Sequence, residues 1–68
     1  MIEIKINTEF IKLDSFLKFS GACSLGSEAK FFIKNGDVKV NGDIELQRGK
    51  KLYNGDTVEF QGENYKIV

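Results

Sequence analysis

Isoleucines occupy every second position at the start of the chain, and charged residues lie between them. The segment reads Ile2, Glu3, Ile4, Lys5 and Ile6. An alternation with a period of two residues is typical of a strand that buries one face. The sequence therefore predicts an N-terminal strand, followed by a turn over residues 7–9, where the alternation stops.

From Leu13 onwards the apolar residues are spaced three and four apart, which is the period of a helix with one buried face. That face consists of Leu13, Phe16, Leu17 and Ser20. Gly21 is well placed to end the helix in the left-handed conformation. A short first helix is predicted between Leu13 and Gly21.

A second helical pattern precedes Gly36 and follows an irregular connector over residues 22–26. Its apolar face contains Ala29, Phe32 and Ile33. Ser24 or Ser27 is expected to cap the start of this helix, because a serine hydroxyl accepts hydrogen bonds from first-turn amides. The helix is predicted over residues 28–34.

Alternation returns at Val38 and predicts short strands in the rest of the chain. The candidate strand segments are 38–40, 44–46, 58–60 and 65–67. Asn41-Gly42 is the strongest hairpin turn signal in the chain. Helices that precede a set of antiparallel strands indicate an α+β fold, with two short packed helices against a small twisted antiparallel sheet.

Length and composition favour a binding module over an enzyme. Sixty-eight residues suffice for a single domain, 1–68, and the content of 41% hydrophobic and 29% charged residues is ordinary for a globular protein. With no histidine and only Cys23, the chain lacks the common general base, an internal disulfide and a zinc site. We expect no catalytic residue, no metal, no cofactor and no membrane segment, and a cytoplasmic location.

The net charge is zero, but the charges are unevenly distributed. Residues 1–11 carry −1, residues 12–51 carry +3 and residues 52–68 carry −2. Within the basic middle, Lys30 and Lys34 share a helix flank, and a loop contains Arg48, Lys50 and Lys51. These cations could contact phosphates or form an ordinary solvated surface. We expect six of these cations to converge on one surface, away from the acids Asp56, Glu59 and Glu63; the six are Lys18, Lys30, Lys34, Arg48, Lys50 and Lys51.

Phe31 is predicted opposite the apolar face of the second helix, which is unusual for a core aromatic. It could provide a platform for an unpaired base, or it could pack as an additional core residue. The sequence favours packing. The other aromatic residues are interpreted as core or core rim: Phe10, Phe16, Phe19, Phe32, Tyr53, Phe60 and Tyr65.

Four blocks together resemble a known RNA-binding family. They are residues 13–18, 27–30, 33–42 and 55–58, which end in Leu-Lys, Ala-Lys, Val-Asn-Gly and Gly-Asp-Thr-Val. The pattern resembles the RNA-binding domain of the ribosomal protein S-four type, also called the alpha-L motif, in its stand-alone bacterial YaaA/YbcJ-like form. The resemblance implies binding of structured RNA, such as ribosomal or transfer RNA, by phosphate and shape readout. The implied RNA-binding residues are Lys18, Lys30, Phe31, Lys34, Arg48, Lys50 and Lys51.

Leu25 and Gly26 replace the Ser-Arg pair that is common in this family before the second helix, and Phe31 replaces a frequent basic residue. These departures leave open a protein-interaction adaptor on the same fold, with a protein partner and reduced RNA affinity. A sulfur-carrier protein, which the N-terminal alternating strand suggests, is not expected, because that class needs a Gly-Gly tail and the sequence reads Lys66-Ile67-Val68 there.

Overall fold

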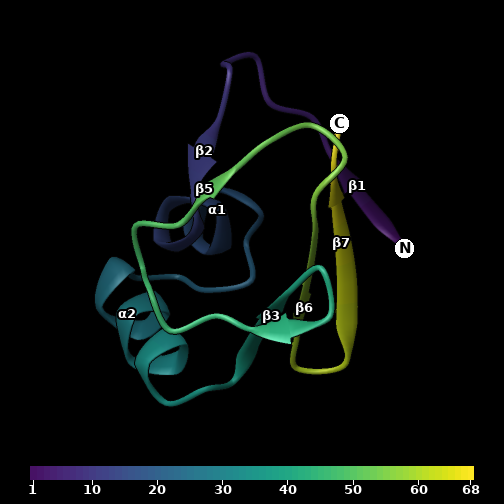
Figure 1. Ribbon diagram of the computed structural model, residues 1–68. Helices are drawn as coiled ribbons and strands as arrows, with labels where there is room; N and C mark the ends of the chain where they lie inside the picture. Colours follow the sequence, from purple (N-terminus) through teal and green to yellow (C-terminus); the bar gives the residue numbers. More distant parts are fainter.

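Two helices lie beside a five-stranded sheet in the computed structural model, which describes residues 1–68 (Figure 1). Helix α1 spans Leu13–Phe19 and helix α2 spans Gly26–Lys34. Both helices were predicted from the apolar spacing. The glycines expected after them, Gly21 and Gly36, adopt φ angles of 82° and 83°, a left-handed conformation that glycine reaches without a Cβ penalty.

The start of α2 differs from the predicted serine cap. The N-cap residue is Leu25, whose side chain cannot accept a hydrogen bond. Glu28 reaches back instead, and its Oε1 accepts hydrogen bonds from the backbone N–H groups of Ser24 and Leu25, both at 3.1 Å. This is the glutamate half of a capping box, and the carboxylate also lies at the positive end of the helix dipole.

The five-stranded sheet has the strand order β1-β7-β6-β3-β4. Its strands are β1 (Ile2–Ile4), β3 (Val38–Val40), β4 (Asp43–Ile44), β6 (Thr57–Phe60) and β7 (Glu63–Ile67). The pairs β3–β4, β3–β6 and β6–β7 are antiparallel, and the first of them is the hairpin that the Asn41-Gly42 turn predicted. The α+β class is confirmed.

Strand β1 gives the sheet a mixed character, because it pairs in parallel with β7. Ile2 lies opposite Tyr65 and Ile4 lies opposite Ile67. A tight hairpin forces two strands to run antiparallel, but both helices separate β1 from β7 along the chain. The direction of this pair is therefore set by packing, and not by a turn that the sequence reveals.

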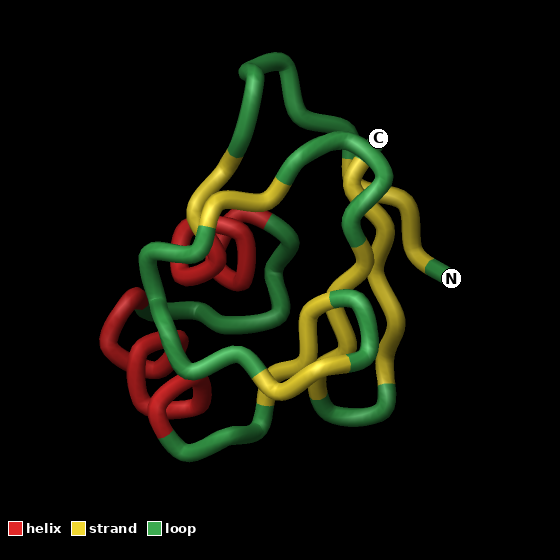
Figure 2. The backbone as a smooth tube through the Cα atoms, in the orientation of Figure 1, coloured by secondary structure: helices red, strands yellow, loops and turns green.

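A separate two-stranded ribbon joins β2 (Ile11–Lys12) to β5 (Lys51–Leu52) in antiparallel register. Neither strand was predicted, because two residues are too few to display an alternating pattern. The chain leaves β4, runs across α2 as a long loop and returns to form β5 beside α1 (Figures 1 and 2).

The core contains thirteen buried residues, contributed by both helices, the sheet and the ribbon. The core prediction is confirmed for Phe16, Phe60 and Tyr65, and Phe32 packs against the core while partly buried. It is wrong for Phe19 and Tyr53, which are 61% and 45% exposed. Phe19 is the last residue of α1, and Tyr53 follows the short strand β5, so neither side chain is enclosed.

Asn41 connects two of the sequence blocks that carried the family resemblance. With φ angles of 51° at Asn41 and 89° at Gly42, the turn has the left-handed geometry of a tight hairpin. The Asn41 side chain donates a hydrogen bond to Asp56 Oδ1 at 3.1 Å and accepts one from the Thr57 amide at 2.9 Å. These hydrogen bonds connect the Val-Asn-Gly block to the Gly-Asp-Thr-Val block, so both blocks have a structural role.

None of the helices is long and apolar enough to cross a membrane.

Candidate nucleic-acid interface

A groove of about 540 Å³ separates α2 from the loop that precedes β5. It is lined by Lys30, Ile33, Lys34, Leu46, Gln47, Arg48 and Gly49. Three of the sequence-predicted site residues, Lys30, Lys34 and Arg48, therefore share one groove. We call it the basic groove, and it combines three cations with aliphatic side chains from both of its walls.

The two lysines of the basic groove project from one flank of α2 without a neutralising acid. They lie four residues apart, and no ion pair within 4.0 Å involves either of them. Like charges at this spacing destabilise a helix by roughly 0.2–0.5 kcal/mol. An anion held between the two side chains would remove that cost.

Arg48 forms the only ion pair within 4.0 Å in the protein, with Asp14 Oδ2 at 3.8 Å. The Arg48 side chain remains 62% exposed. A solvent-exposed pair at this distance contributes at most about 1 kcal/mol. The guanidinium is therefore oriented towards α1 but keeps donors for an external anion, such as a bidentate phosphate.

The basic loop is attached to the start of α1 by backbone hydrogen bonds. The N–H of Leu13 donates to the carbonyl of Lys50 at 2.9 Å, and the N–H of Asp14 donates to the carbonyl of Arg48 at 3.1 Å. First-turn amides of a helix have no partner within the helix. Here the loop supplies those partners, so Arg48 and Lys50 are positioned by a helix terminus although they lie on a loop.

The ribbon adds a cation that sequence analysis missed. Lys12 lies directly opposite Lys51, and both residues are exposed. Like charges directly opposite each other on a sheet are destabilising. Lys51 Nζ lies 4.7 Å from the centre of the Phe10 ring, a cation–π geometry. The missed signal was the pairing of two-residue strands, which only the structure reveals.

Four predicted site residues lie outside the basic groove: Lys50 and Lys51, described above, and two residues on the helices. Lys18 borders a shallow depression on α1 together with Ile11, Ser15 and Phe19. Phe31 is 62% exposed, so the packing interpretation favoured by the sequence is wrong. Its ring contacts Phe32 edge-on at 5.4 Å between centroids, and Phe32 in turn contacts the buried Phe60 at 5.1 Å. Phe31 is thus the exposed end of an aromatic row anchored in the core.

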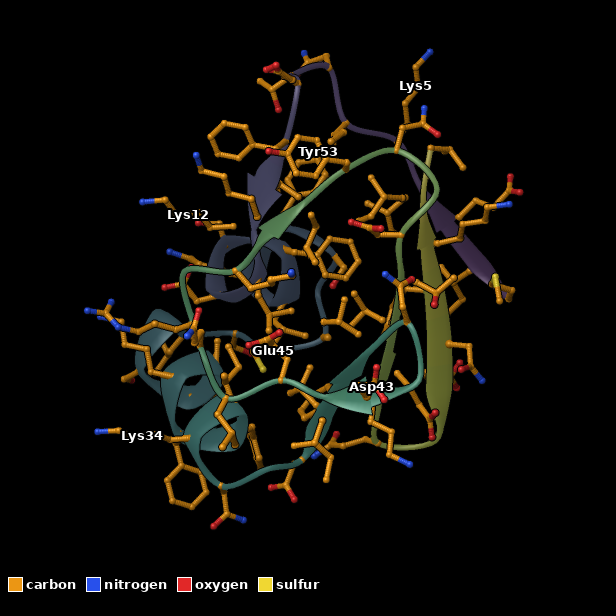
Figure 3. All side chains as sticks on the ribbon, in the orientation of Figure 1. Lys5, Lys12, Lys34, Asp43, Glu45 and Tyr53 are labelled. Carbon is orange, nitrogen blue, oxygen red and sulfur yellow. The ribbon has the colours of Figure 1, made fainter.

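The charges divide between the two halves of the molecule. Residues 10–36 and 45–53, which include the ribbon, both helices and the basic loop, contain seven lysines and arginines against three acids, a formal charge of +4. We call this half the basic side. The remaining residues carry −4. Lys12 and Lys34 project from the half that contains the helices, whereas Asp43 lies over the sheet (Figure 3).

Two buried groups away from the basic groove have a raised pKa. Burial raises the pKa of the Cys23 thiol, and the nearby Glu28 carboxylate raises it further. Burial likewise raises the pKa of Tyr65, with smaller contributions from Glu63 and Cys23. A buried thiol with a raised pKa stays protonated at neutral pH and is a poor nucleophile.

Comparison with protein families matches the S4 domain model over residues 4–68, nearly the whole chain. Among curated proteins, a probable ribosome maturation protein of Bacillus subtilis, RlbA, is 44% identical over 59 residues, which cover 87% of this chain and 83% of the relative. YbcJ of Escherichia coli is 36% identical over 58 residues, which cover 85% of this chain and 83% of that protein.

Solved structures give the same fold. The solution structure of Escherichia coli YbcJ, described as containing an alpha-L motif involved in RNA binding, superposes with a TM-score of 0.76 at 32% identity, covering 100% of this chain and 87% of YbcJ. Ribosomal protein S4e of Thermoplasma acidophilum gives a TM-score of 0.69 at 26% identity, covering 91% of this chain but only 33% of S4e.

Proposed function

This chain belongs to the S4 domain family, and from that premise we propose that it is a small RNA-binding protein that contacts structured RNA through its basic side. The observation that carries the proposal is the basic groove, where Lys30, Lys34 and Arg48 converge. The alpha-L motif of the structurally similar YbcJ, described as involved in RNA binding, supports it.

Phosphate contacts supply the affinity in this proposal. Arg48 engages a phosphate bidentately, while Lys30 and Lys34 act as point charges along the neighbouring backbone. Cations on a helix flank and on a loop fixed to a helix start have a defined spacing, so they suit a phosphate backbone of fixed shape. Phosphate contacts carry no sequence information, so shape decides which RNA binds.

Ribosomal RNA is the proposed target, with transfer RNA as the second RNA to test. The name of the Bacillus subtilis relative, a probable ribosome maturation protein, favours the ribosomal setting. We place the protein in the cytoplasm, as a binder without catalysis. The few cations on the basic side favour modest affinity at physiological salt, so a ribosomal particle is a better setting than free RNA.

Filter binding to ribosomal and transfer RNA across a salt series tests the proposal. The Lys50→Ala/Lys51→Ala variant should weaken binding about equally for different sequences and should flatten the salt dependence, because fewer counterions are released. The matched control is Lys39→Ala/Lys66→Ala, which removes the same charge from the sheet and should leave both quantities unchanged. Absence of salt-dependent binding by the intact protein at low ionic strength would contradict the proposal and favour the adaptor with a protein partner.

A further inference from the structure

The ribbon has an outer face built from two aromatic residues and two lysines. Ile11 pairs with Leu52, and Lys12 pairs with Lys51. Continuing this antiparallel register by one residue places Phe10 opposite Tyr53. Side chains alternate between the two faces of a strand, and Leu52 is buried. The outer ribbon face therefore consists of Phe10, Lys12, Lys51 and Tyr53.

Observed contacts agree with this arrangement. The Phe10 and Tyr53 rings lie 6.0 Å apart between centroids, inclined by 50°. Lys51 Nζ lies 4.7 Å from the Phe10 ring centre. Lys51 therefore covers the Phe10 ring, whereas the Tyr53 ring leans on Phe10 and remains 45% exposed. Figure 3 shows Tyr53 on the side of the molecule where the ribbon lies.

A purely structural role explains the aromatic pair but not the lysine pair. Cross-strand aromatic pairs stabilise a sheet, whereas directly opposed lysines destabilise it. The outer face of the large sheet avoids such a pair, since Lys39 lies opposite Glu59 there. An anion at the ribbon would neutralise Lys12 and Lys51, and the exposed ring beside them offers a flat surface for a planar group.

We propose that the outer ribbon face is a binding site for an unpaired nucleotide, with its base stacked on Tyr53 and its flanking phosphate held between Lys12 and Lys51. This inference rests on the proposed RNA-binding function and adds a contact that a fully paired RNA cannot make. Base–aromatic stacking is sequence-tolerant, because every base presents a π face. The ribbon thus selects RNA with bulged or looped nucleotides over a continuous duplex.

Tyrosine fluorescence gives a direct test, because the chain has two tyrosines and no tryptophan, and the second tyrosine, Tyr65, is buried. The probes are an RNA hairpin with one bulged adenosine, the same hairpin with an abasic bulge and a fully paired hairpin. Wild-type fluorescence should be quenched by the bulged adenosine only. Tyr53→Phe should bind it as tightly as wild type but without the quenching, because the ring is retained and the Tyr53 signal is lost.

Tyr53→Leu keeps apolar packing against Phe10 and removes the π face. It should bind the bulged-adenosine hairpin about tenfold more weakly, with an unchanged salt slope, and should bind the abasic and paired hairpins like wild type. A melting curve close to that of wild type shows that the variant is folded. Equal affinity of Tyr53→Leu and wild type for the bulged hairpin, or an equal loss on all three RNAs, overturns the stacking site and leaves phosphate binding intact. Absence of salt-dependent binding to any hairpin overturns both proposals.

Discussion

The ribbon and the five-stranded sheet differ in how their exposed charged residues are paired across the strands. On the sheet, Lys39 lies opposite Glu59, and Glu3 lies opposite Lys66, so each cation has an acid across from it. On the ribbon, Lys12 lies opposite Lys51. The charges of the sheet pairs neutralise each other, whereas the two lysines of the ribbon repel each other, and an external anion would relieve that repulsion.

This contrast shows why the net charge says little about the partner. The charge of zero is the sum of +4 on the basic side and −4 on the rest of the chain. A polyanion near the protein experiences the local field of the basic side, because charges farther away than a Debye length of about 8–10 Å are screened. The molecule measures 27 × 21 × 18 Å, so its opposite surfaces lie farther apart than one such length.

The largest effect on RNA binding is expected from removing the three cations of the basic groove. The triple variant Lys30→Ala/Lys34→Ala/Arg48→Ala should weaken RNA binding about 100-fold at low salt and reduce the salt slope by about two, because three phosphate contacts are lost. Filter binding measures both quantities. Removing Lys39 and Lys66 from the sheet should change affinity less than twofold, and an equal loss in that control would contradict a sided interface.

Asn41 tests whether the sheet contributes to stability without contributing to RNA binding. Asn41→Ala should destabilise the protein by about 1–2 kcal/mol, because the hydrogen bonds to Asp56 and Thr57 are lost and alanine is disfavoured at φ 51°. Asn41→Gly keeps the turn geometry and should cost less. Urea denaturation measures the stability, and the salt slope of RNA binding should stay at the wild-type value. A changed slope would place Asn41 in the interface.

The aromatic row has an exposed end at Phe31 and a buried end at Phe60, and substitutions at the two ends should have different effects. If the exposed ring of Phe31 stacks on an RNA base, Phe31→Ala should weaken binding to looped RNA about fivefold without altering the salt slope. Stability should fall by less than about 1 kcal/mol, since the ring is 62% exposed. Phe60→Ala, at the buried end of the row, should instead cost about 3–5 kcal/mol in a urea titration. A large stability loss for Phe31→Ala with unchanged RNA affinity would assign the ring a packing role.

The smallest effect concerns the two cross-strand pairs themselves. Lys12→Glu should stabilise the protein by about 0.2–1 kcal/mol, because it places an acid opposite Lys51, and should weaken RNA binding. Lys39→Glu, its mirror experiment, places an acid opposite Glu59 and should destabilise the protein by a similar amount while leaving RNA binding unchanged. Urea midpoints and filter binding on both variants check the signs. Destabilisation by Lys12→Glu would show that the lysine pair is not repulsive.

Local patterns predicted the parts of this fold that local interactions determine. The spacing from Leu13 predicted α1, and the glycines after both helices and in the Asn41-Gly42 turn adopt the expected left-handed geometry. Non-local contacts explain two of the failures, because the parallel β1–β7 pair and the two-residue ribbon depend on chain segments far apart in sequence. The third failure is local: the Glu28 side chain, and not a serine, caps the start of α2, and the spacing of residues alone does not orient that side chain.

The candidate site was predictable as a set of charges but not as a surface. The helix period placed Lys30 beside Lys34, whereas the contribution of Arg48 required the loop to fold back onto α1. Lys12 was missed because its importance comes from lying opposite Lys51. The exposure of Tyr53 was missed because no pattern reports how short a strand will be.

Chemical-shift mapping with the intact ¹⁵N-labelled protein and a bulged RNA hairpin at low salt tests the sided interface most directly. We predict that the perturbed amides lie in residues 10–36 and 45–53 and that raising the salt concentration reverses the shifts. The amides of β1, β6 and β7 should stay at their free positions. Perturbations centred on those three strands, or shifts that persist unchanged at high salt, would contradict RNA binding by the basic side.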